Sequence, residues 1–128
     1  MSKPRTFVLG DIHGNYKAFD QCLERSHFDL DVDTLIQLGD VCDRHDQSAY
    51  VVDQLIQIPN LVSIRGNHDL WLKSWLENGV APVGWEDQGG LATIKSYETV
   101  SIDKEQHLAF LEKQLNHYID SQNRLFVH

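Results

Sequence analysis

Three short apolar runs, each ending at or just before a glycine, constrain the fold of this chain most strongly. Their length is that of a strand, and they span residues 6–9, 34–38 and 61–64. Helical spacing of apolar residues follows each run, at about residues 15–25, 51–56 and 70–76. Strands that alternate with helices are typical of a parallel sheet with crossover helices. The sequence therefore predicts an α/β fold.

The last third of the chain is less regular. Gly79 to Gly90 contains four glycines and a proline, and we predict a long loop there. Asp103 to Tyr118 is predicted to be a helix, with Asp103 as its N-cap. A further strand is predicted over Arg124 to Val127. The length of 128 residues suits one domain with one core, and not two full domains.

Composition narrows the classes of function. The net charge of −8, from 11 basic and 19 acidic residues, disfavours a general nucleic-acid binder, which would carry a basic patch. A phosphate substrate stays compatible with this charge, because bound divalent cations reverse the sign of the local field. The sequence has neither an apolar run of membrane-spanning length nor a signal peptide at Met1 to Arg5. We therefore expect a cytoplasmic protein that binds neither nucleic acid nor membrane.

Polar side chains follow the glycine that closes each predicted strand. The three segments are Gly10-Asp11-Ile12-His13-Gly14, Gly39-Asp40-Val41-Cys42-Asp43-Arg44 and Gly66-Asn67-His68-Asp69. In open parallel sheets, function lies in the loops beyond the carboxyl ends of the strands. One Asp-x-His at a strand end is more often a turn with a solvated histidine. Three such segments after three separate strands argue against coincidence.

The residue types predict a site for two metal ions. Asp11 and His13 are two residues apart, so an extended backbone points both side chains the same way. A carboxylate beside an imidazole suits manganese, iron or zinc better than calcium. Asp40 is placed to bridge two ions, and Asn67 offers an amide oxygen to the second. Two ions about 3.5–4 Å apart clamp the attacking and leaving oxygens of an in-line displacement at phosphorus.

Together, the three segments resemble the signature of the calcineurin-like metallophosphoesterase superfamily. That signature runs Gly-Asp-x-His-Gly, Gly-Asp-x-x-Asp-Arg-Gly, then Gly-Asn-His-Asp or -Glu. Asp43 with Arg44, and Arg65 before Gly66, resemble the branch of Ser/Thr protein phosphatases and their bacterial relatives. The resemblance implies a two-sheet sandwich flanked by helices. This chain would supply the first sheet with its helices and the start of the second sheet.

The resemblance also implies a role for each matching residue. One metal would be held by Asp11, His13 and Asp40, and the other by Asp40, Asn67 and His128. Manganese is the metal we most expect, with iron or zinc as alternatives. His128 matches because residues 125–128 resemble the strand that ends in the family's His-Gly-Gly motif. The alternative for His128 is a histidine on a frayed chain end.

Acid catalysis and phosphate binding are implied for four further positions. His68 would protonate the leaving oxygen, and Asp43 would orient its ring. Arg44, together with Asn67, would bind the phosphoryl oxygens, which the planar guanidinium fork suits. Arg65 would either assist or form a structural ion pair. His45 stands where the family usually has glycine after Arg44, so this turn must be built differently.

Two features of the family lie downstream of its His-Gly-Gly motif: a metal-binding histidine in a Gly-His segment and a substrate arginine. The sequence contains neither. We therefore expect residues 1–128 to be a calcineurin-like phosphoesterase domain truncated at its C-terminus.

The function implied is metal-dependent hydrolysis of phosphate monoesters, on a phosphorylated protein or a small phosphoester. One alternative is a symmetrical dinucleoside-tetraphosphatase. The segment Gly66 to Leu70 fits that enzyme somewhat better, because eukaryotic protein phosphatases usually have glutamate where this chain has Asp69. A second alternative is a non-catalytic fragment or binding module, which the missing ligands favour.

Several other residues are predicted to have no part in the site. Cys22, Trp71 and Trp75 are expected in the core, on the apolar faces of their helices. The remaining histidines outside the three segments are expected to be solvated: His27, His107 and His117.

Overall fold

The predicted strands form a three-stranded parallel sheet in the computed structural model, which describes residues 3–128. The strands are β1 (Thr6–Leu9), β2 (Thr34–Gln37) and β3 (Leu61–Ser63), and they lie side by side in chain order. Thr6 lies opposite Thr34, and Leu35 lies opposite Leu61. The predicted α/β class is confirmed.

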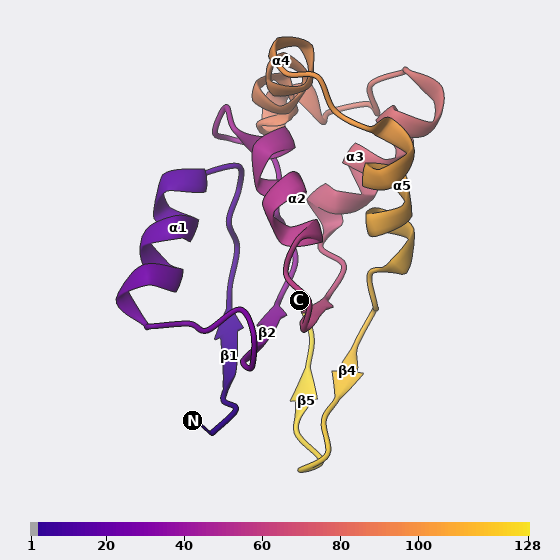
Figure 1. Cartoon of the computed structure of the whole chain (residues 1–128). Coiled ribbons are helices and arrows are strands. Elements are labelled where there is room, and N and C mark those ends of the chain that lie inside the picture. Colours follow the sequence, from indigo (N-terminus) through magenta and orange to yellow (C-terminus); the bar gives the residue numbers. More distant parts are fainter. Residues whose placement is uncertain (1–2) are drawn as a thin grey trace.

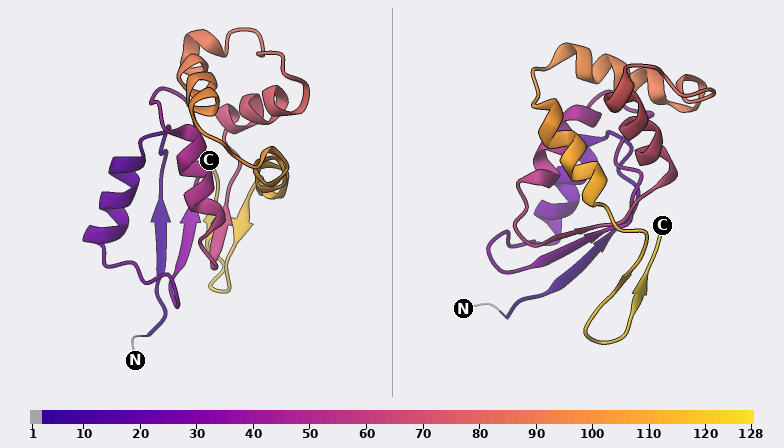
Figure 2. Two further views of the ribbon diagram at one scale, coloured as in Figure 1. Left: turned by 45° about the horizontal axis from the view of Figure 1, so that its top comes forward. Right: turned by 90° about the vertical axis from the view of Figure 1, so that its right-hand side faces the viewer.

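Helices cover one side of this sheet (Figure 1). They are α1 (Tyr16–Arg25), α2 (Ser48–Ile56), α3 (Asn67–Asn78), the 3-10 turn η1 (Glu86–Gln88), α4 (Gly90–Thr99) and α5 (Lys104–Lys113). An antiparallel hairpin of β4 (Tyr118–Ile119) and β5 (Leu125–Phe126) follows them. The right-hand view of Figure 2 shows this hairpin beyond the sheet, away from the helices. In that arrangement the chain holds one sheet with its helices and the beginning of a second layer.

The central strand β2 is covered on both faces. Leu35 packs into the helix-side core together with Val52 and Leu55 of α2, and all three are buried. Ile36 points to the other face, because successive residues of a strand alternate, and it is only 1% exposed. Both faces of β2 are therefore buried at this point.

Local signals explain where several helices begin and end. Asn15 caps α1 by accepting the N–H of Ala18, and Asp103 caps α5, as predicted, by accepting the N–H of Gln106. The prediction that α5 extends to Tyr118 is wrong. The chain leaves the helix after Lys113 because Leu115 pairs with the end of β3 instead.

Three further expectations differ from the structure. The segment predicted as a loop up to Gly90 contains η1 and leads into α4, which was not predicted. Cys22 is exposed, because it lines an open groove between α1 and β1 together with Val8 and Leu9. His107 is fully buried rather than solvated.

Buried His107 joins three helices. Its Nδ1 lies 2.7 Å from the hydroxyl of Tyr97 in α4, and its Nε2 lies 2.5 Å from Oδ1 of Asp53 in α2. Burial raises the pKa of the Tyr97 hydroxyl well above its ordinary value, so this hydroxyl keeps its proton. Both ring nitrogens of His107 therefore have partners, which makes its burial in α5 tolerable.

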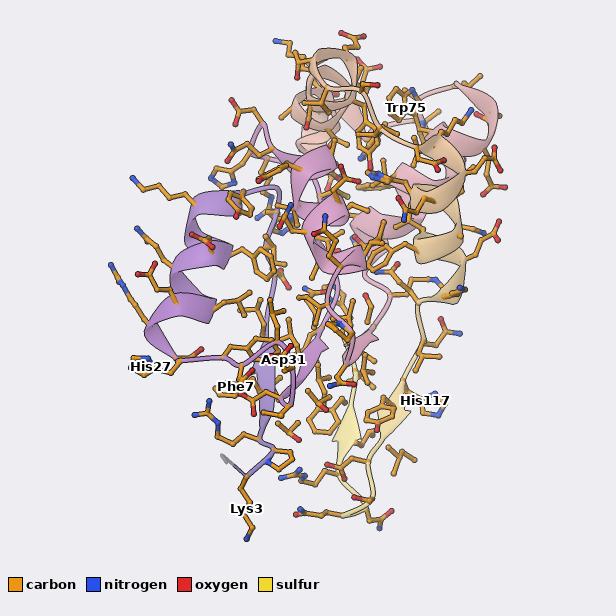
Figure 3. The ribbon with its side chains drawn as sticks, viewed as in Figure 1. Lys3, Phe7, His27, Asp31, Trp75 and His117 are labelled. Atoms are coloured by element: carbon orange, nitrogen blue, oxygen red, sulfur yellow. The ribbon has the colours of Figure 1, made fainter. Side chains whose placement is uncertain are left out.

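The expectations for two histidines and two tryptophans outside the site agree with the structure. His27 and His117 lie exposed at the periphery (Figure 3), and Trp71 and Trp75 are partly buried against the core. Across residues 3–128, none of the helices combines the length and the apolar character needed to cross a membrane.

Candidate active site

The three polar segments converge at one edge of the sheet, as predicted. The N–H groups of Ile12 and His13 both donate to the carbonyl oxygen of Asp40, at 3.1 and 3.0 Å. Gly39 brings the second and third segments together, because it is left-handed (φ 98°) and a Cβ there would lie 2.6 Å from the nitrogen of Gly66. A residue with a side chain would force these strand ends apart.

Asp40 lies at the centre of this junction and is buried. Its Oδ1 accepts the N–H of His68 at 3.0 Å. Its Oδ2 faces two histidines, 3.8 Å from Nε2 of His13 and 3.2 Å from Nε2 of His128. A Cβ on Gly66 would overlap this carboxylate, so glycine is required there too. One oxygen of Asp40 is thus used by the backbone, and the other is turned to the histidines.

His13 and His128 are held in the same way. Nδ1 of His13 lies 2.8 Å from the carbonyl oxygen of Cys42, and Nδ1 of His128 lies 2.7 Å from that of Leu38. A carbonyl oxygen can only accept a hydrogen bond, so each Nδ1 carries a proton. In the neutral rings, the lone pair is then on Nε2, which is the atom that faces Asp40. This is the usual arrangement of a metal-ligating histidine.

Asp11 completes the cluster. Asp11, Asp40 and His128 each present one ligand atom, and these atoms all lie within 4.8 Å of one another. Nε2 of His13 lies 3.4 Å from Oδ2 of Asp11. Two carboxylates this close repel each other unless a cation lies between them. Imidazole nitrogens with carboxylate oxygens suit manganese, iron or zinc, so the residues fit the metals predicted from the sequence.

His68 and Asp43 form a buried pair beside this cluster. Nδ1 of His68 lies 2.6 Å from Oδ2 of Asp43, and their side chains are only 4% and 0% exposed. Nδ1 therefore donates to the carboxylate, and Nε2 is left for another partner. The rings of His68 and His13 meet edge to face with 5.1 Å between their centroids. The predicted acid pair and the predicted metal ligands are thus neighbours.

Arg44 and Asn67 border the same edge of the sheet with exposed side chains. Arg44 follows Asp43 in a turn whose two left-handed residues are Asp43 (φ 77°) and Arg44 (φ 75°). His45, at the family's glycine position, is tied back through its N–H and Nδ1 to the carbonyl oxygen of His13. The strained residues of this turn therefore precede position 45.

Comparison with protein families decides where this arrangement belongs. Residues 4–125 match the family model described as calcineurin-like phosphoesterase. The chain is a member of the calcineurin-like phosphoesterase family.

Curated relatives of this phosphoesterase carry two different names. Serine/threonine-protein phosphatase 2 of Escherichia coli (strain K12) is 34% identical over 84 residues, which cover 66% of this chain and 38% of the relative. The symmetrical bis(5'-nucleosyl)-tetraphosphatase of Dechloromonas aromatica (strain RCB) is 34% identical over 83 residues, which cover 64% of this chain and 30% of that protein. The matched residues thus span only 30–38% of the length of these two relatives.

Solved structures agree on the fold of the phosphoesterase. A metallophosphoesterase from Sphaerobacter thermophilus matches 90% of this chain and 42% of its own, with a TM-score of 0.60 and 24% identity. A protein serine/threonine phosphatase from Saccharomyces cerevisiae matches 98% of this chain and 41% of its own, with a TM-score of 0.60 and 18% identity. At these identities the likeness concerns the fold alone.

Asp69 closes the third segment, and the sequence predicted no role for it, but the structure shows one. Its carboxylate accepts the N–H groups of Asp40, Val41 and Gly66 at 2.9–3.0 Å, and Nε2 of Gln114 at 3.0 Å. Burial raises the pKa of this carboxyl, although the hydrogen bonds from Gly66, Val41 and Gln114 oppose the rise. Asp69 therefore ties the second and third segments of the phosphoesterase together and links both to the end of α5.

Arg65 has a structural role, and its partners differ from the predicted ion pair. Its guanidinium donates to the carbonyl oxygen of Gln114 at 2.7 Å and to the side-chain oxygen of Asn116 at 2.6 Å. Longer bonds reach the carbonyl oxygens of Leu111 and Glu112. A cation at the C-terminal end of α5 stabilises that end of the helix, whose last carbonyl groups are otherwise unpaired.

Proposed function

We propose that this phosphoesterase hydrolyses phosphate monoesters of the kind found on serine and threonine residues of proteins or on small molecules. The observation that carries the proposal is the shared geometry of His13 and His128. Both rings are protonated at Nδ1 and present Nε2 to the same oxygen of Asp40. An arrangement in which two imidazoles and two carboxylates converge is suited to metal binding.

The ligand sets follow from the resemblance, and the distances among Asp11, His13, Asp40 and His128 are compatible with them. Asp11, His13 and Asp40 would hold the first ion, and Asp40, Asn67 and His128 would hold the second. When bound, a pair of divalent ions supplies positive charge for the phosphoryl oxygens and lowers the pKa of water toward neutrality. Manganese is the proposed metal, with iron or zinc as alternatives. Asp40 is the ligand that both ions would share.

His68 is the proposed general acid. With Nδ1 on the Asp43 carboxylate, its Nε2 can hold a proton for the leaving oxygen, and the buried carboxylate stabilises the ring while both nitrogens are protonated. Arg44 would bind the phosphoryl oxygens through its planar fork, and Asn67 would assist. Both side chains are exposed at this edge and accessible to a substrate.

A symmetrical dinucleoside-tetraphosphatase is the second candidate. Several curated relatives carry that name, among them a protein of Baumannia cicadellinicola that is 41% identical over 68 residues, which are 52% of this chain and 24% of that protein. The metal ligands and acid would be the same in both activities. The two activities are distinguished by measuring turnover of a phosphopeptide and of a dinucleoside tetraphosphate under the same conditions.

Two further proposals concern the protein as a whole. We propose that the domain continues beyond residues 1–128 in the complete enzyme, because the chain covers only 38% of the E. coli relative. A non-catalytic binding module remains the alternative for the 128-residue chain itself. The cytoplasm is the proposed location, on the sequence grounds given above.

The first test is manganese binding by wild-type protein and two matched variants. Asp40→Asn keeps the size of the side chain but removes the shared carboxylate, and it should lower manganese affinity by at least about 10–100-fold. Asp31→Asn is the control, because Asp31 is exposed in the connection before β2, at the opposite end of the strands (Figure 3). Isothermal titration should give wild-type affinity for the control. Equal manganese affinity in Asp40→Asn and wild type would refute the metal assignment.

A further inference from the structure

The segment from Trp85 to Thr93 closes over the carboxylate of Asp43. Three donors meet this buried carboxylate: Nδ1 of His68 at 2.6 Å and Nε1 of Trp85 at 2.7 Å, both on Oδ2, and the hydroxyl of Thr93 at 2.6 Å on Oδ1. Two of the three donors, Trp85 and Thr93, therefore come from a segment that contains none of the proposed metal ligands. A rotation of the carboxylate would lose more than one of these bonds.

The direction of the Thr93 hydroxyl is fixed by its neighbours. An ionised carboxylate only accepts hydrogen bonds, so the Thr93 hydroxyl donates to Oδ1 of Asp43. Its oxygen is then the acceptor for the N–H of Asp43 at 2.8 Å and for the hydroxyl of Ser48 at 3.0 Å. Thr93 thus binds both the side chain and the backbone of Asp43. Valine, which has nearly the same shape, can do neither.

The same segment holds a strained turn. Asp43 and Arg44 are both left-handed, a conformation that is strained for a residue with a side chain. The N–H of Asp43 is bound by Ser48 and Thr93, and the N–H of Arg44 donates to the carbonyl oxygen of Gly89 at 3.0 Å. These bonds offset the strain and fix the direction in which Asp43 leaves the backbone.

Two adjacent glycines allow the segment to come this close. Gly89 is left-handed (φ 105°), and a Cβ there would lie 2.6 Å from the nitrogen of Arg44. A Cβ on Gly90 would overlap the indole ring of Trp85. The close contact between this segment and the Asp43 turn therefore depends on the absence of side chains at both positions.

We propose that Trp85 and Thr93 are positioning residues that hold the Asp43 carboxylate in the one orientation that binds Nδ1 of His68. Their contribution to catalysis rests on the proposed role of His68 as the general acid. Their side-chain hydrogen bonds run to Asp43 and Ser48 and not to the proposed metal ligands, so they act through Asp43. Loss of either bond should therefore weaken proton donation and leave metal binding unchanged.

Helix α4 offers a matched control. Ser96 is also buried in α4, and its hydroxyl accepts the N–H of Ala49 in α2 at 3.0 Å. Ser96→Ala removes one buried hydroxyl from the contact between α4 and α2, and this hydroxyl does not bind Asp43. Thr93→Val removes the hydroxyl that binds Asp43, and Thr93→Ser should retain that hydroxyl and its bond. Trp85→Phe removes the indole donor but also leaves a cavity. If Trp85→Phe fails to fold for that reason, Thr93→Val alone decides the outcome.

The first measurement needs no metal and no activity. The proton on Nδ1 of His68 should give a slowly exchanging, downfield NMR signal in the metal-free chain, because it is buried in a 2.6 Å hydrogen bond. We expect Thr93→Val to shift this signal or abolish it through faster exchange, and Ser96→Ala and Thr93→Ser to retain it. A signal unchanged in Thr93→Val, or changed equally in Ser96→Ala, would overturn the proposal.

The second measurement compares leaving groups in the presence of manganese. For Thr93→Val we expect kcat on an alkyl phosphate to fall by about 10-fold or more, within the 10²–10⁴ that a general acid contributes. On an aryl phosphate, whose leaving group needs little protonation, kcat should change far less, with KM unchanged in both cases. An equal loss across leaving groups would contradict a role through His68. If the wild-type chain hydrolyses neither ester, the proposed activity is absent from the 128-residue chain, and the NMR signal alone decides the positioning role.

Discussion

Replacement of Asp69 by asparagine should destabilise the junction on which the site is built. Asp69 Oδ2 accepts three donors, from Asp40, Gly66 and Gln114, and Oδ1 accepts the N–H of Val41. An amide has only one acceptor oxygen. In the best orientation of the asparagine side chain, its oxygen replaces Oδ2 and keeps the three donors there. Its NH2 group then replaces Oδ1 and cannot accept the N–H of Val41.

The size of the effect follows from that geometry. One hydrogen bond to a charged acceptor is lost, which is worth about 1.5–3 kcal/mol, and one buried N–H is left unpaired at a cost of about 1–3 kcal/mol. Part of this is regained, because burial raises the pKa of Asp69 and a neutral amide avoids the cost of a buried charge. We therefore expect Asp69→Asn to lower the free energy of unfolding by about 2–4 kcal/mol.

Urea denaturation followed by tryptophan fluorescence measures this change. Asp31→Asn again serves as the control, since an exposed substitution should stay within about 0.5 kcal/mol of wild type. A change in Asp69→Asn no larger than in the control would mean that the four donors find other partners. It would refute the role of Asp69 as the link between the segments.

Two further predictions concern acid stability and the general acid. Burial alone would raise the pKa of the Asp33 carboxyl, but hydrogen bonds from the N–H of Asp29 and from Arg5 hold it below its ordinary value. Its contribution to stability is therefore present above about pH 4 and is lost as the pH falls through the lowered pKa, so Asp33→Asn should show a shallower loss of stability in acid. His68→Asn should lower kcat far more than KM, and the effect should shrink for aryl phosphates; a uniform loss across leaving groups would indicate a structural role instead.

The parts of the fold that the sequence predicted are those in which local pattern and tertiary burial agree. β1 is observed with the predicted bounds, since its short apolar run ends directly before Gly10. Helix α4 was missed because its buried residues are Gly90, Thr93 and Ser96, which form no apolar stripe. These small residues are buried because other segments pack closely against them, which no local pattern reveals.

His107 illustrates the same limit for a polar residue. Within its own helix it looks like a solvated histidine, because its neighbours in sequence are polar on one side. Its partners, Tyr97 and Asp53, lie 10 and 54 residues away along the chain. Only the packing of α2, α4 and α5 against one another brings them together.

The part of the site that follows from the topology of a parallel sheet was predicted from the sequence. Parallel strands bring their carboxyl ends to one edge, so the convergence of Asp11, His13 and Asp40 followed from three glycine-led segments. The pair of His68 with Asp43 came from the family resemblance, and the structure brings the two residues together. The role of Asp69 and the segment from Trp85 to Thr93 were not predicted. Their contacts join residues up to 50 positions apart, and nothing in the local sequence marks them.

Anomalous scattering from crystals grown with manganese tests the central claim most directly. The account predicts a manganese peak within bonding distance of Asp11, His13 and Asp40, because these three ligands lie on anchored strand ends. In the 128-residue chain we expect this ion to be held more tightly than a second one beside Asn67 and His128. A peak elsewhere on the protein, or no peak at this cluster at saturating manganese, would contradict the account.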